Sequence, residues 1–389
     1  MRPGRPDRED GGERDLSGMK RKRIMVAMSG GVDSSVAALL LKQRGCEIVG
    51  VTMCLGLAGR EGTNRQCCGP EGVSDARKVC DTIGIPHYVL DFSPYFERYV
   101  IRDFVEEYVA GRTPNPCVRC NQFLKFDVLL RKAKTMGFDG LATGHYAKIV
   151  AHDGICRLVR PGDRKKDQTY FLYGIPREHL ISIEFPLGEL TKDEVRGIAA
   201  RAGLRVAEKP ASQDICFVGE NYRSVIPDRF KTRGNIMDTR GEVVGTHDGI
   251  INYTIGQRRG LGIATGRPMY VTRIDPVSNT IHVGPREELR STGLIASGLN
   301  LLADSLPRSV SCRMRYASAA SACSVRTRGD RVEVSFAAPG EAVTPGQSVV
   351  FYDGDTVLGG GIIEAATSGR SEYGMTGGGR PGEGECEAA

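Results

Sequence analysis

Apolar positions in the first half of the chain alternate between short runs and longer helical patterns. IMVAM, EIVGVTM and PHYVLDF are short runs rich in apolar and β-branched residues, and the segments VAALLLKQRG and SDARKVCDTIG between them have helical spacing. This alternation, from about Arg23 to about Gly203, predicts a parallel sheet with helices on both faces. In such sheets, ligands bind beyond the carboxyl ends of the strands.

The pattern changes after about Pro210. Short β-prone runs separated by glycine-rich turns, among them GEVVGTHDG, INYTIGQ and NTIHVG, predict a small β-rich domain. From about Leu294 the runs from IASGLNLL to TVLGGGIIE predict a six-stranded barrel. The predicted organisation is a disordered extension at 1–20, an α/β domain at 21–210, a central β-rich domain at 211–288, a β-barrel at 289–366 and a disordered tail at 367–389.

Charge and cysteine content narrow the class of protein. The chain has 389 residues and a formal net charge of +6, which allows a nucleic-acid partner without requiring one. No apolar run is long enough to span a bilayer, and the polar N-terminus is unlike a signal peptide. We therefore expect a soluble, cytoplasmic protein with no membrane partner. In that compartment the 12 cysteines favour thiol or metal chemistry over a disulfide scaffold.

The first candidate site is the stretch AMSGGVDSSV, residues 27–36. A strand, a tight Gly-Gly turn and a helix N-terminus are expected here, and together they bind anions through backbone N–H groups. The Walker A pattern, with its lysine, is absent. Such a loop suits an enzyme that holds the β,γ-pyrophosphate of ATP while the α-phosphate is transferred as AMP. Asp33 is the candidate ligand for Mg²⁺.

Two further stretches carry cysteines. TPNPCVRCN places Cys117 and Cys120 in C-x-x-C spacing, which fits a redox pair, half of a zinc site or a pair of cluster ligands. Arg112 and Arg119 lie close enough in sequence to favour a thiolate. The stretch ASQDICF carries Cys216, which taken alone is more typical of a core residue than of a catalytic one.

Eight segments resemble, in order and spacing, the motifs of the tRNA-specific 2-thiouridylases, which modify the wobble uridine of certain tRNAs. They are MSGGVDSSVAALLL, CCGPEGVSDARKVCDTIGIPHYVLD, TPNPCVRCNQFLKF, LATGHYA, KKDQTYFLYG, ASQDICFV, INYTIGQRRGLGI and TPGQSVVFYDG. The resemblance implies a doubly wound parallel sheet of the PP-loop, adenine nucleotide alpha-hydrolase-like type, then a small central domain and a C-terminal β-barrel.

The resemblance also implies residue roles. The family's nucleophilic cysteine aligns with Cys120 and its persulfide-bearing cysteine with Cys216. The positions that align with its ATP site are Ala27, Met28, Ser29, Gly30, Gly31, Val32, Asp33, Ser34, Met53 and Gly144. The target-base positions are Asn115, Pro116 and Cys117. The tRNA-contact positions are His145, Lys166, Asp167, Gln168, Arg315, Tyr316 and Gln347.

The implied reaction is ATP-dependent 2-thiolation of the wobble uridine. Uridine O2 attacks the α-phosphorus, pyrophosphate leaves, and a persulfide on Cys216 delivers sulfur as AMP departs. The implied cofactors are ATP and Mg²⁺. The implied partners are tRNA and a sulfur-donor protein, either a cysteine desulfurase or a sulfur relay protein.

Cys117 departs from well-known members, which carry Asp at this position. With Cys120 and Cys216, this third thiol leaves open a second route, in which a [4Fe–4S] cluster on three cysteines carries sulfide. The residues also leave open an AMP-forming PP-loop enzyme that acts on a small metabolite, and a cysteine-bound zinc protein that binds RNA.

Overall fold

Five parallel strands form the first sheet of the computed structural model, which describes residues 21–56, 70–210, 215–217 and 225–368. The strands are β1 (Arg23–Ala27), β2 (Glu47–Cys54), β3 (His87–Asp91), β4 (Gly140–Ala142) and β7 (Ile183–Glu184). Their spatial order is β3-β2-β1-β4-β7, so the order reverses between β1 and β4. Ligands of doubly wound sheets bind beyond the carboxyl ends of the strands at such a reversal.

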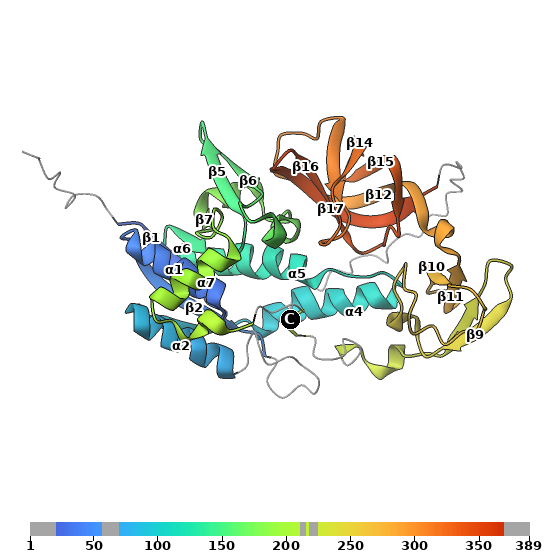
Figure 1. The fold of residues 1–389 in the computed structure, drawn as a ribbon, viewed down its shortest axis with the longest axis horizontal. Coiled ribbons are helices and arrows are strands. Elements are labelled where there is room, and N and C mark those ends of the chain that lie inside the picture. The colour runs from blue at the N-terminus through green and yellow to red at the C-terminus, as the bar shows by residue number, and fades with distance from the viewer. Residues whose placement is uncertain (1–20, 57–69, 211–214, 218–224, 369–389) are drawn as a thin grey trace, which may run out of the picture.

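Side chains of β1 show that both faces of this sheet are covered. Ile24 and Val26 are buried with α1 (Val32–Gln43), α2 (Pro70–Ile83) and α7 (Lys192–Arg201). Met25 is buried in a second cluster with residues of the opposite helical layer. That layer comprises α3 (Ser93–Phe96), α4 (Arg102–Val109), α5 (Pro116–Arg119), α6 (Leu130–Thr135) and the π-helical segments Glu97–Ile101 and Cys120–Leu129. The predicted doubly wound α/β class is confirmed (Figure 1).

The central β-rich domain is a small mixed sheet in the order β10-β11-β8-β9. Its strands are β8 (Gly234–Met237), β9 (Val243–His247), β10 (Tyr270–Asp275) and β11 (Thr280–Gly284). Strands β11 and β8 pair in parallel, and the other neighbours pair antiparallel. The run INYTIGQ, expected to be β-prone, instead begins with a 3-10 turn over Ile250–Asn252.

The C-terminal domain is a barrel that closes on itself. Its strands are β12 (Arg290–Leu301), β13 (Ser309–Arg313), β14 (Ser321–Arg328), β15 (Arg331–Glu341), β16 (Ser348–Asp353) and β17 (Thr356–Thr367). The order is β12-β15-β14-β13-β16-β17, and β17 also pairs with β12, which closes the ring. Each of the six predicted runs contributes a strand, and the predicted barrel is confirmed.

One hairpin from the first half of the chain pairs with the barrel. Strands β5 (Lys148–His152) and β6 (Ile155–Val159) follow β4 in sequence, yet β6 pairs with β17 through Val159 and Thr356. In Figure 1 the hairpin stands beside the barrel, away from the parallel sheet. The segment that returns from the hairpin to the α/β domain therefore lies against the barrel.

Asp167, in that returning segment, is a buried carboxylate at the domain junction. It is 2% exposed. Its Oδ2 accepts hydrogen bonds from Arg160 Nε at 2.8 Å and from Arg313 Nη1 of β13 at 3.0 Å. Its Oδ1 accepts from the backbone N–H of Thr169 at 2.9 Å and from the Thr169 hydroxyl at 2.6 Å. A buried charge with this many donors is fully paired, so the carboxylate joins the α/β domain to the barrel.

We predict that Asp167→Asn lowers the free energy of unfolding by about 3 kcal/mol, because it leaves the buried Arg313 guanidinium and the partly buried Arg160 guanidinium without their anion. The matched control is Asp355→Asn, which breaks the more exposed Arg164–Asp355 pair and should cost less than about 1 kcal/mol. Since the chain has no tryptophan, circular dichroism in increasing urea is the suitable measurement. Equal losses for the two variants would contradict this role for Asp167.

Candidate functional site

The loop between β1 and α1 is folded as an anion cradle. Gly30 adopts φ +73°, and a Cβ there would lie 2.4 Å from Gly72 O, so only glycine fits. Gly31 is the N-cap residue of α1 and, as a glycine, has no side chain to cap the first-turn N–H groups of the helix. The Ser34 hydroxyl bonds within the loop, to Ser29 N and Gly31 O. The first-turn N–H groups of α1, together with the helix dipole, therefore form a site for an anion.

Most side chains of this loop point into the protein. Met28, Val32 and Ser34 are buried, so these residues can offer only their main chain to a ligand. Ala27 ends β1 beside Val51 of β2, and Met53 lies two residues further along β2. The predicted ATP positions 27–34 and Met53 thus share the carboxyl edge of the sheet. Their contact with a nucleotide stays a prediction.

Gly144 lies against the start of α1. A Cβ on Gly144 would come within 2.5 Å of Ser34 N and 2.6 Å of Asp33 C, both backbone atoms. The loop after β4 therefore approaches the PP-loop as closely as two backbones can. This contact brings two stretches more than 100 residues apart in sequence into one crevice, as their places after β1 and β4 predict.

Asp33 is already paired, contrary to the expectation that its carboxylate is available for a metal. Lys192 Nζ, at the first residue of α7, lies 2.6 Å from Oδ1 and 2.7 Å from Oδ2 of Asp33. The Tyr146 hydroxyl donates to Oδ1 at 2.9 Å. The carboxylate is one third exposed and lies at the loop, so it fits Mg²⁺ held by one carboxylate plus phosphate and water oxygens.

Sequence reasoning missed Lys192. The local signal was present, because Thr191 and Glu194 form a capping box that marks the start of a helix. Nothing in that box indicates which loop the helix faces. A second lysine, Lys209, also reaches the loop, with its Nζ 3.5 Å from Gly30 O and 2.8 Å from Asp75 Oδ2. Two lysines distant in sequence therefore flank a loop that has none of its own.

The stretch 113–117 lies where the three domains meet. Thr113 N donates to Pro345 O, and Thr113 Oγ1 donates to Thr254 Oγ1 of the central domain. Gln347 of the barrel donates to Thr113 O at 2.9 Å and Pro114 O at 3.1 Å. The predicted target-base residues Asn115, Pro116 and Cys117 follow directly, with Asn115 capping α5 through its side chain.

Cys117 and Cys120 lie one helical turn apart. Cys117 is in α5, and Cys120 opens a ten-residue π-helical segment. Residues three apart on a helix share a face, and π-helical geometry, which is rare, occurs frequently at functional sites. Both cysteines are partly exposed, as is Cys216.

Helix α4 anchors the neighbours of both predicted catalytic cysteines. Arg119, before Cys120, pairs with Asp103 of α4 at 2.9 Å. Phe217, after Cys216, packs edge-on against Phe104 of α4, with ring centroids 5.4 Å apart. Consecutive residues of one helix therefore hold the two segments, and both cysteines pack against the same hydrophobic cluster. The stretches 211–214 and 218–224 around Cys216 lie outside the described residues, and direct approach of the two sulfurs stays a prediction.

One expectation about this region needs correction. Arg112 is paired with Glu107 and Arg119 with Asp103, so neither guanidinium is left to favour a thiolate. Burial raises the pKa of Glu107, and the charge of Arg112 offsets only part of this rise. Among the described residues, no group of three Cys, His, Asp or Glu side chains is arranged to hold a metal ion, and a cluster on Cys117, Cys120 and Cys216 stays an untested alternative.

The predicted tRNA-contact residues divide into two groups. Tyr316 is 38% exposed and stacks at an angle on Phe171, with centroids 4.6 Å apart, and Lys166 is half-buried in a turn. The others bond inward: Gln168 to Tyr146 N, Arg315 to Ala342 O, and Gln347 and Asp167 as above. Asp167 is the clearest correction, because its buried, saturated carboxylate cannot reach RNA. Contact of Lys166 and Tyr316 with tRNA stays a prediction.

His145 is also directed inward. Its Nδ1 lies 2.7 Å from Thr143 Oγ1, and its ring lies between Phe126 and Phe185. Burial, with the nearby charge of Lys125, holds the pKa of His145 well below its usual range. The ring is therefore neutral at pH 7 and cannot pair with a phosphate as a cation.

Comparison with known proteins identifies the family. Residues 22–220 match the tRNA methyl transferase HUP domain, 225–285 the tRNA methyl transferase PRC-barrel domain and 291–363 the aminomethyltransferase beta-barrel domain. The tRNA-specific 2-thiouridylase MnmA 1 of Syntrophus aciditrophicus is 52% identical over 349 residues, covering 89% of this chain and 94% of that protein. The chain belongs to the tRNA-specific 2-thiouridylase family.

Further members of the 2-thiouridylase family are as similar. MnmA of Geotalea uraniireducens is 49% identical and covers 90% of this chain and 96% of that protein. MnmA of Geobacter metallireducens is 50% identical, and the match covers 89% of this chain and 98% of that protein. The domain descriptions mention methyl transfer, but these relatives align over almost their whole length and are named thiouridylases. Within the described ranges, no helix is long and apolar enough to cross a bilayer.

We predict that Gly144→Ala weakens ATP binding at least about tenfold, or about 1.4 kcal/mol, because the new methyl group pushes the start of α1 out of place. Isothermal titration calorimetry with ATP measures this. Gly197→Ala is the control, since a Cβ there meets only the flexible end of Arg201 at 3.3 Å in the middle of α7. Unchanged ATP affinity in Gly144→Ala would show that the contact between these loops does not shape the nucleotide site.

Proposed function

We propose that the protein catalyses ATP-dependent 2-thiolation of the wobble uridine in tRNA, in the cytoplasm. The observation that carries the proposal is the anion cradle at residues 28–34, facing Gly144, in a chain whose relatives along nearly their whole length are named 2-thiouridylases. A cradle made of backbone N–H groups, with no lysine within the loop, suits pyrophosphate as a leaving group.

The first step activates the base. Uridine O2 attacks the α-phosphorus of ATP, a new O–P bond forms, and the bond to the bridging oxygen of pyrophosphate breaks. Oxygen is a poor leaving group from an amide-like carbon, and adenylation turns it into AMP. Mg²⁺ neutralises the phosphates when it is bound, with Asp33 as its protein ligand. The N–H groups at the start of α1 stabilise the negative charge on the departing pyrophosphate.

The second step transfers sulfur. A sulfur-donor protein, either a cysteine desulfurase or a sulfur relay protein, first charges Cys216 as a persulfide. The terminal sulfur attacks C2 of the adenylated base, and AMP leaves with the former O2. The Cys120 thiolate then attacks the Cys216 sulfur, so the S–S bond breaks, the terminal sulfur stays on C2 and a Cys120–Cys216 disulfide forms. An external thiol must reduce this disulfide before the next turnover.

Cys117 has no separate chemical role in this scheme. It lies on the same helical face as Cys120, beside the target-base loop. The route through sulfide on a [4Fe–4S] cluster predicts about four irons per chain in anaerobically purified protein. The persulfide route predicts full activity without bound iron, and Cys117→Asp should retain it.

We predict that Cys120→Ser and Cys216→Ser each abolish 2-thiouridine formation and leave ATP affinity unchanged, because each removes a sulfur that the transfer needs. Reconstituted thiolation with a persulfide donor, followed by nucleoside mass spectrometry, measures the product. The control is Cys156→Ser on the β5–β6 hairpin, which should behave like the wild type. Substantial thiolation by either single variant would remove its cysteine from the mechanism.

The adenylation step has its own test. The wild type should release one pyrophosphate and one AMP per thiouridine, only when tRNA is present. Products consisting of ADP and phosphate would contradict the proposal. Pyrophosphate release driven by a small metabolite in place of tRNA would favour another AMP-forming PP-loop enzyme.

We predict that Tyr316→Ala weakens tRNA binding about tenfold, since one stacked base contributes about 1–3 kcal/mol. Lys166→Ala should lower the slope of log affinity against log salt concentration by about 0.7 to 0.9, the range for one phosphate contact in single-stranded and duplex nucleic acid. Tyr316→Ala should bind ATP normally. Lys134→Ala, an exposed lysine on α6, is the control for charge alone. If ATP and tRNA affinities fall together in Tyr316→Ala, this side chain supports the fold and does not form an RNA surface.

A further inference from the structure

The Lys192–Asp33 pair joins the start of α7 to the PP-loop at the start of α1. Lys192 Nζ is bidentate to Asp33 and lies 5.9 Å from the centroid of the Tyr146 ring. Its side chain is only 12% exposed. The start of α7 is held in place by the Thr191–Glu194 capping box and by Lys192 N, which donates to Asp163 Oδ2 at 3.0 Å. The ammonium group is therefore positioned at the N-terminal turn of α1.

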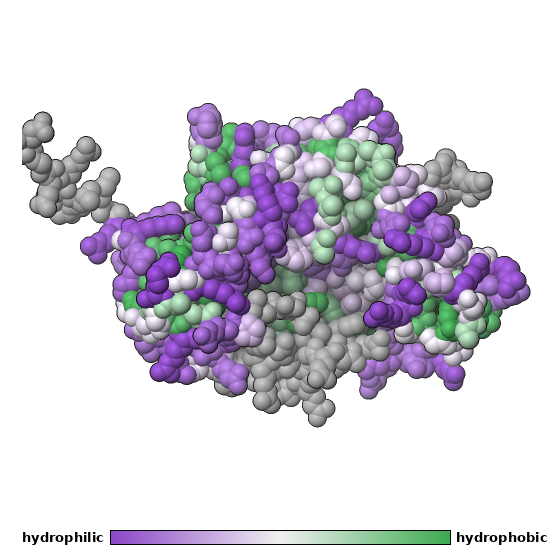
Figure 2. All heavy atoms as spheres, viewed as in Figure 1, coloured by the Kyte–Doolittle hydropathy of each residue, from purple (hydrophilic) through white to green (hydrophobic). Residues whose placement is uncertain are grey.

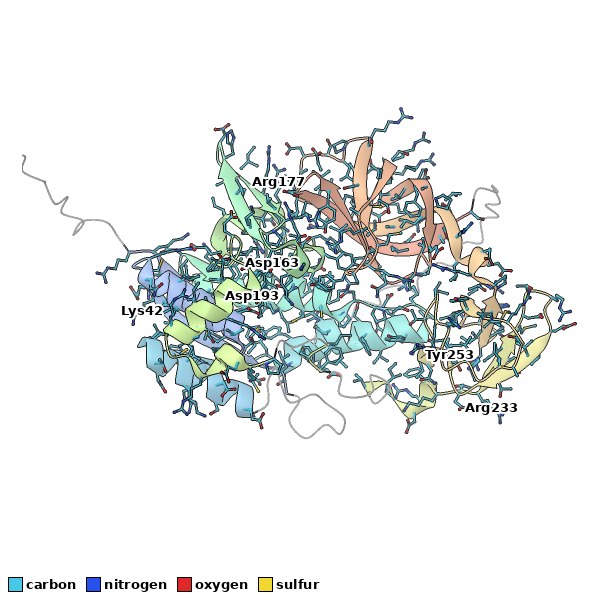
Figure 3. All side chains as sticks on the ribbon, in the orientation of Figure 1. Lys42, Asp163, Arg177, Asp193, Arg233 and Tyr253 are labelled. Atoms are coloured by element: carbon cyan, nitrogen blue, oxygen red, sulfur yellow. The ribbon has the colours of Figure 1, made fainter. Side chains whose placement is uncertain are left out.

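A cavity of about 460 Å³ opens beside this pair. Four cationic side chains and two carboxylates line it, together with Pro210: Lys165, Lys166, Lys192, Arg196, Asp163 and Asp193. Figure 3 shows Asp163 and Asp193 close together near α7, and Figure 2 shows a largely hydrophilic surface over this region.

Two of the lining positions connect the cavity to the PP-loop. Lys192 contacts Asp33, and Pro210 directly follows Lys209, whose Nζ lies near Gly30 O. The Asp163 carboxylate is already used by two backbone N–H groups, those of Lys165 and Lys192. The cavity thus presents an excess of positive charge directly beside the anion cradle, which attracts a group with several negative charges.

We infer that this cavity receives the β- and γ-phosphates of ATP, and that Lys192 exchanges partners when ATP binds. Without nucleotide, Lys192 neutralises Asp33. With nucleotide, its ammonium group turns to the terminal phosphates and leaves the Asp33 carboxylate to Mg²⁺. α7 thereby supplies the lysine that the loop itself lacks. The inference rests on the proposed use of ATP and adds the residue that grips the leaving group.

The exchange keeps every charge paired. Lysine carries its charge on a flexible four-carbon stem and binds phosphate as a point charge, so a small rotation is enough to change partner. Mg²⁺ prefers carboxylate and phosphate oxygens, and it competes with the ammonium group for the same carboxylate. The Tyr146 hydroxyl, which donates to Asp33 Oδ1, keeps that carboxylate in place during the change.

The first experiment measures ligand affinity in Lys192→Gln by calorimetry, with inorganic pyrophosphate, ATP and AMP as separate ligands. Affinity for pyrophosphate and ATP should fall at least tenfold, while affinity for AMP, which lacks both phosphates, and for tRNA should stay the same. Lys192→Arg should restore part of the loss. The control is Lys148→Gln, which breaks a surface pair with Glu189.

The second experiment measures Mn²⁺ binding to the nucleotide-free protein by electron paramagnetic resonance, with Mn²⁺ as the probe for Mg²⁺. Lys192→Gln should bind Mn²⁺ more tightly than the wild type, because the competing ammonium group is gone. Asp33→Asn should bind it more weakly. The double variant Asp33→Asn/Lys192→Gln removes both charges together, and its melting temperature shows whether the fold tolerates the loss of the pair.

Opposite changes in affinity for pyrophosphate and Mn²⁺ support the exchange, because a merely structural lysine would not strengthen metal binding. Three results would overturn it: unchanged pyrophosphate affinity in Lys192→Gln, an equal loss for AMP, or a loss confined to tRNA, which would make the cavity an RNA-phosphate site. Normal tRNA-dependent pyrophosphate release by Lys192→Gln would refute the inference alone. Lys192-dependent pyrophosphate binding without any thiolation by the wild type would refute the proposed function alone.

Discussion

The buried Asp167 carboxylate fixes the geometry on which the rest of the molecule depends. It pairs with Arg160 on its own segment and with Arg313 of the barrel, at 2.8 and 3.0 Å. Removing a charge from water is costly, so the fold tolerates this group only where its partners are in place. The barrel can therefore dock on the α/β domain in one orientation. In that orientation Gln347 and Pro345 hold the loop at residues 113–117.

Helix α4 and the loop at residues 113–117 contact both the domain interfaces and the segments that carry the predicted catalytic cysteines. Thr113 contacts both the barrel and the central domain, and Asp103 and Phe104 of α4 anchor the neighbours of Cys120 and Cys216. The thiol region and the nucleotide cradle thus belong to one packed unit made from all three domains. Sulfur transfer to an adenylated base requires such an arrangement, because the reacting atoms must be held within bonding distance.

Local features of the sequence predicted much of this fold. The β-branched runs around β1 and β2, the Gly-Gly turn and the six short barrel runs each carry their own signal, and each formed the predicted element. Long-range contacts were not predictable in the same way. The β5–β6 hairpin pairs with β17, and Lys192 reaches Asp33 across 159 residues. Tertiary packing determines both contacts, so they cannot be predicted from the spacing of residues along the chain.

In the candidate site, too, features that follow from sheet topology were predictable, and features set by long-range side-chain contacts were not. Gly144 and the PP-loop were expected to share a crevice because both follow strands of one parallel sheet, and backbone contact brings them together. Asp33 was expected as a metal ligand, and Arg112 and Arg119 as charges that favour a thiolate, from the residues near them in sequence. Asp167 was expected as a tRNA contact from the family resemblance. Each of these side chains instead pairs with another side chain of the protein.

Adenylation of uridine O2 is the central chemical claim, and oxygen labelling tests it directly. A tRNA carrying ¹⁸O at C2 of the target uridine is thiolated with unlabelled ATP and water, and the AMP is analysed by mass spectrometry. If O2 attacks the α-phosphorus and leaves with the phosphate, each AMP formed carries one ¹⁸O atom. Unlabelled AMP, with the label released into water, would contradict the account.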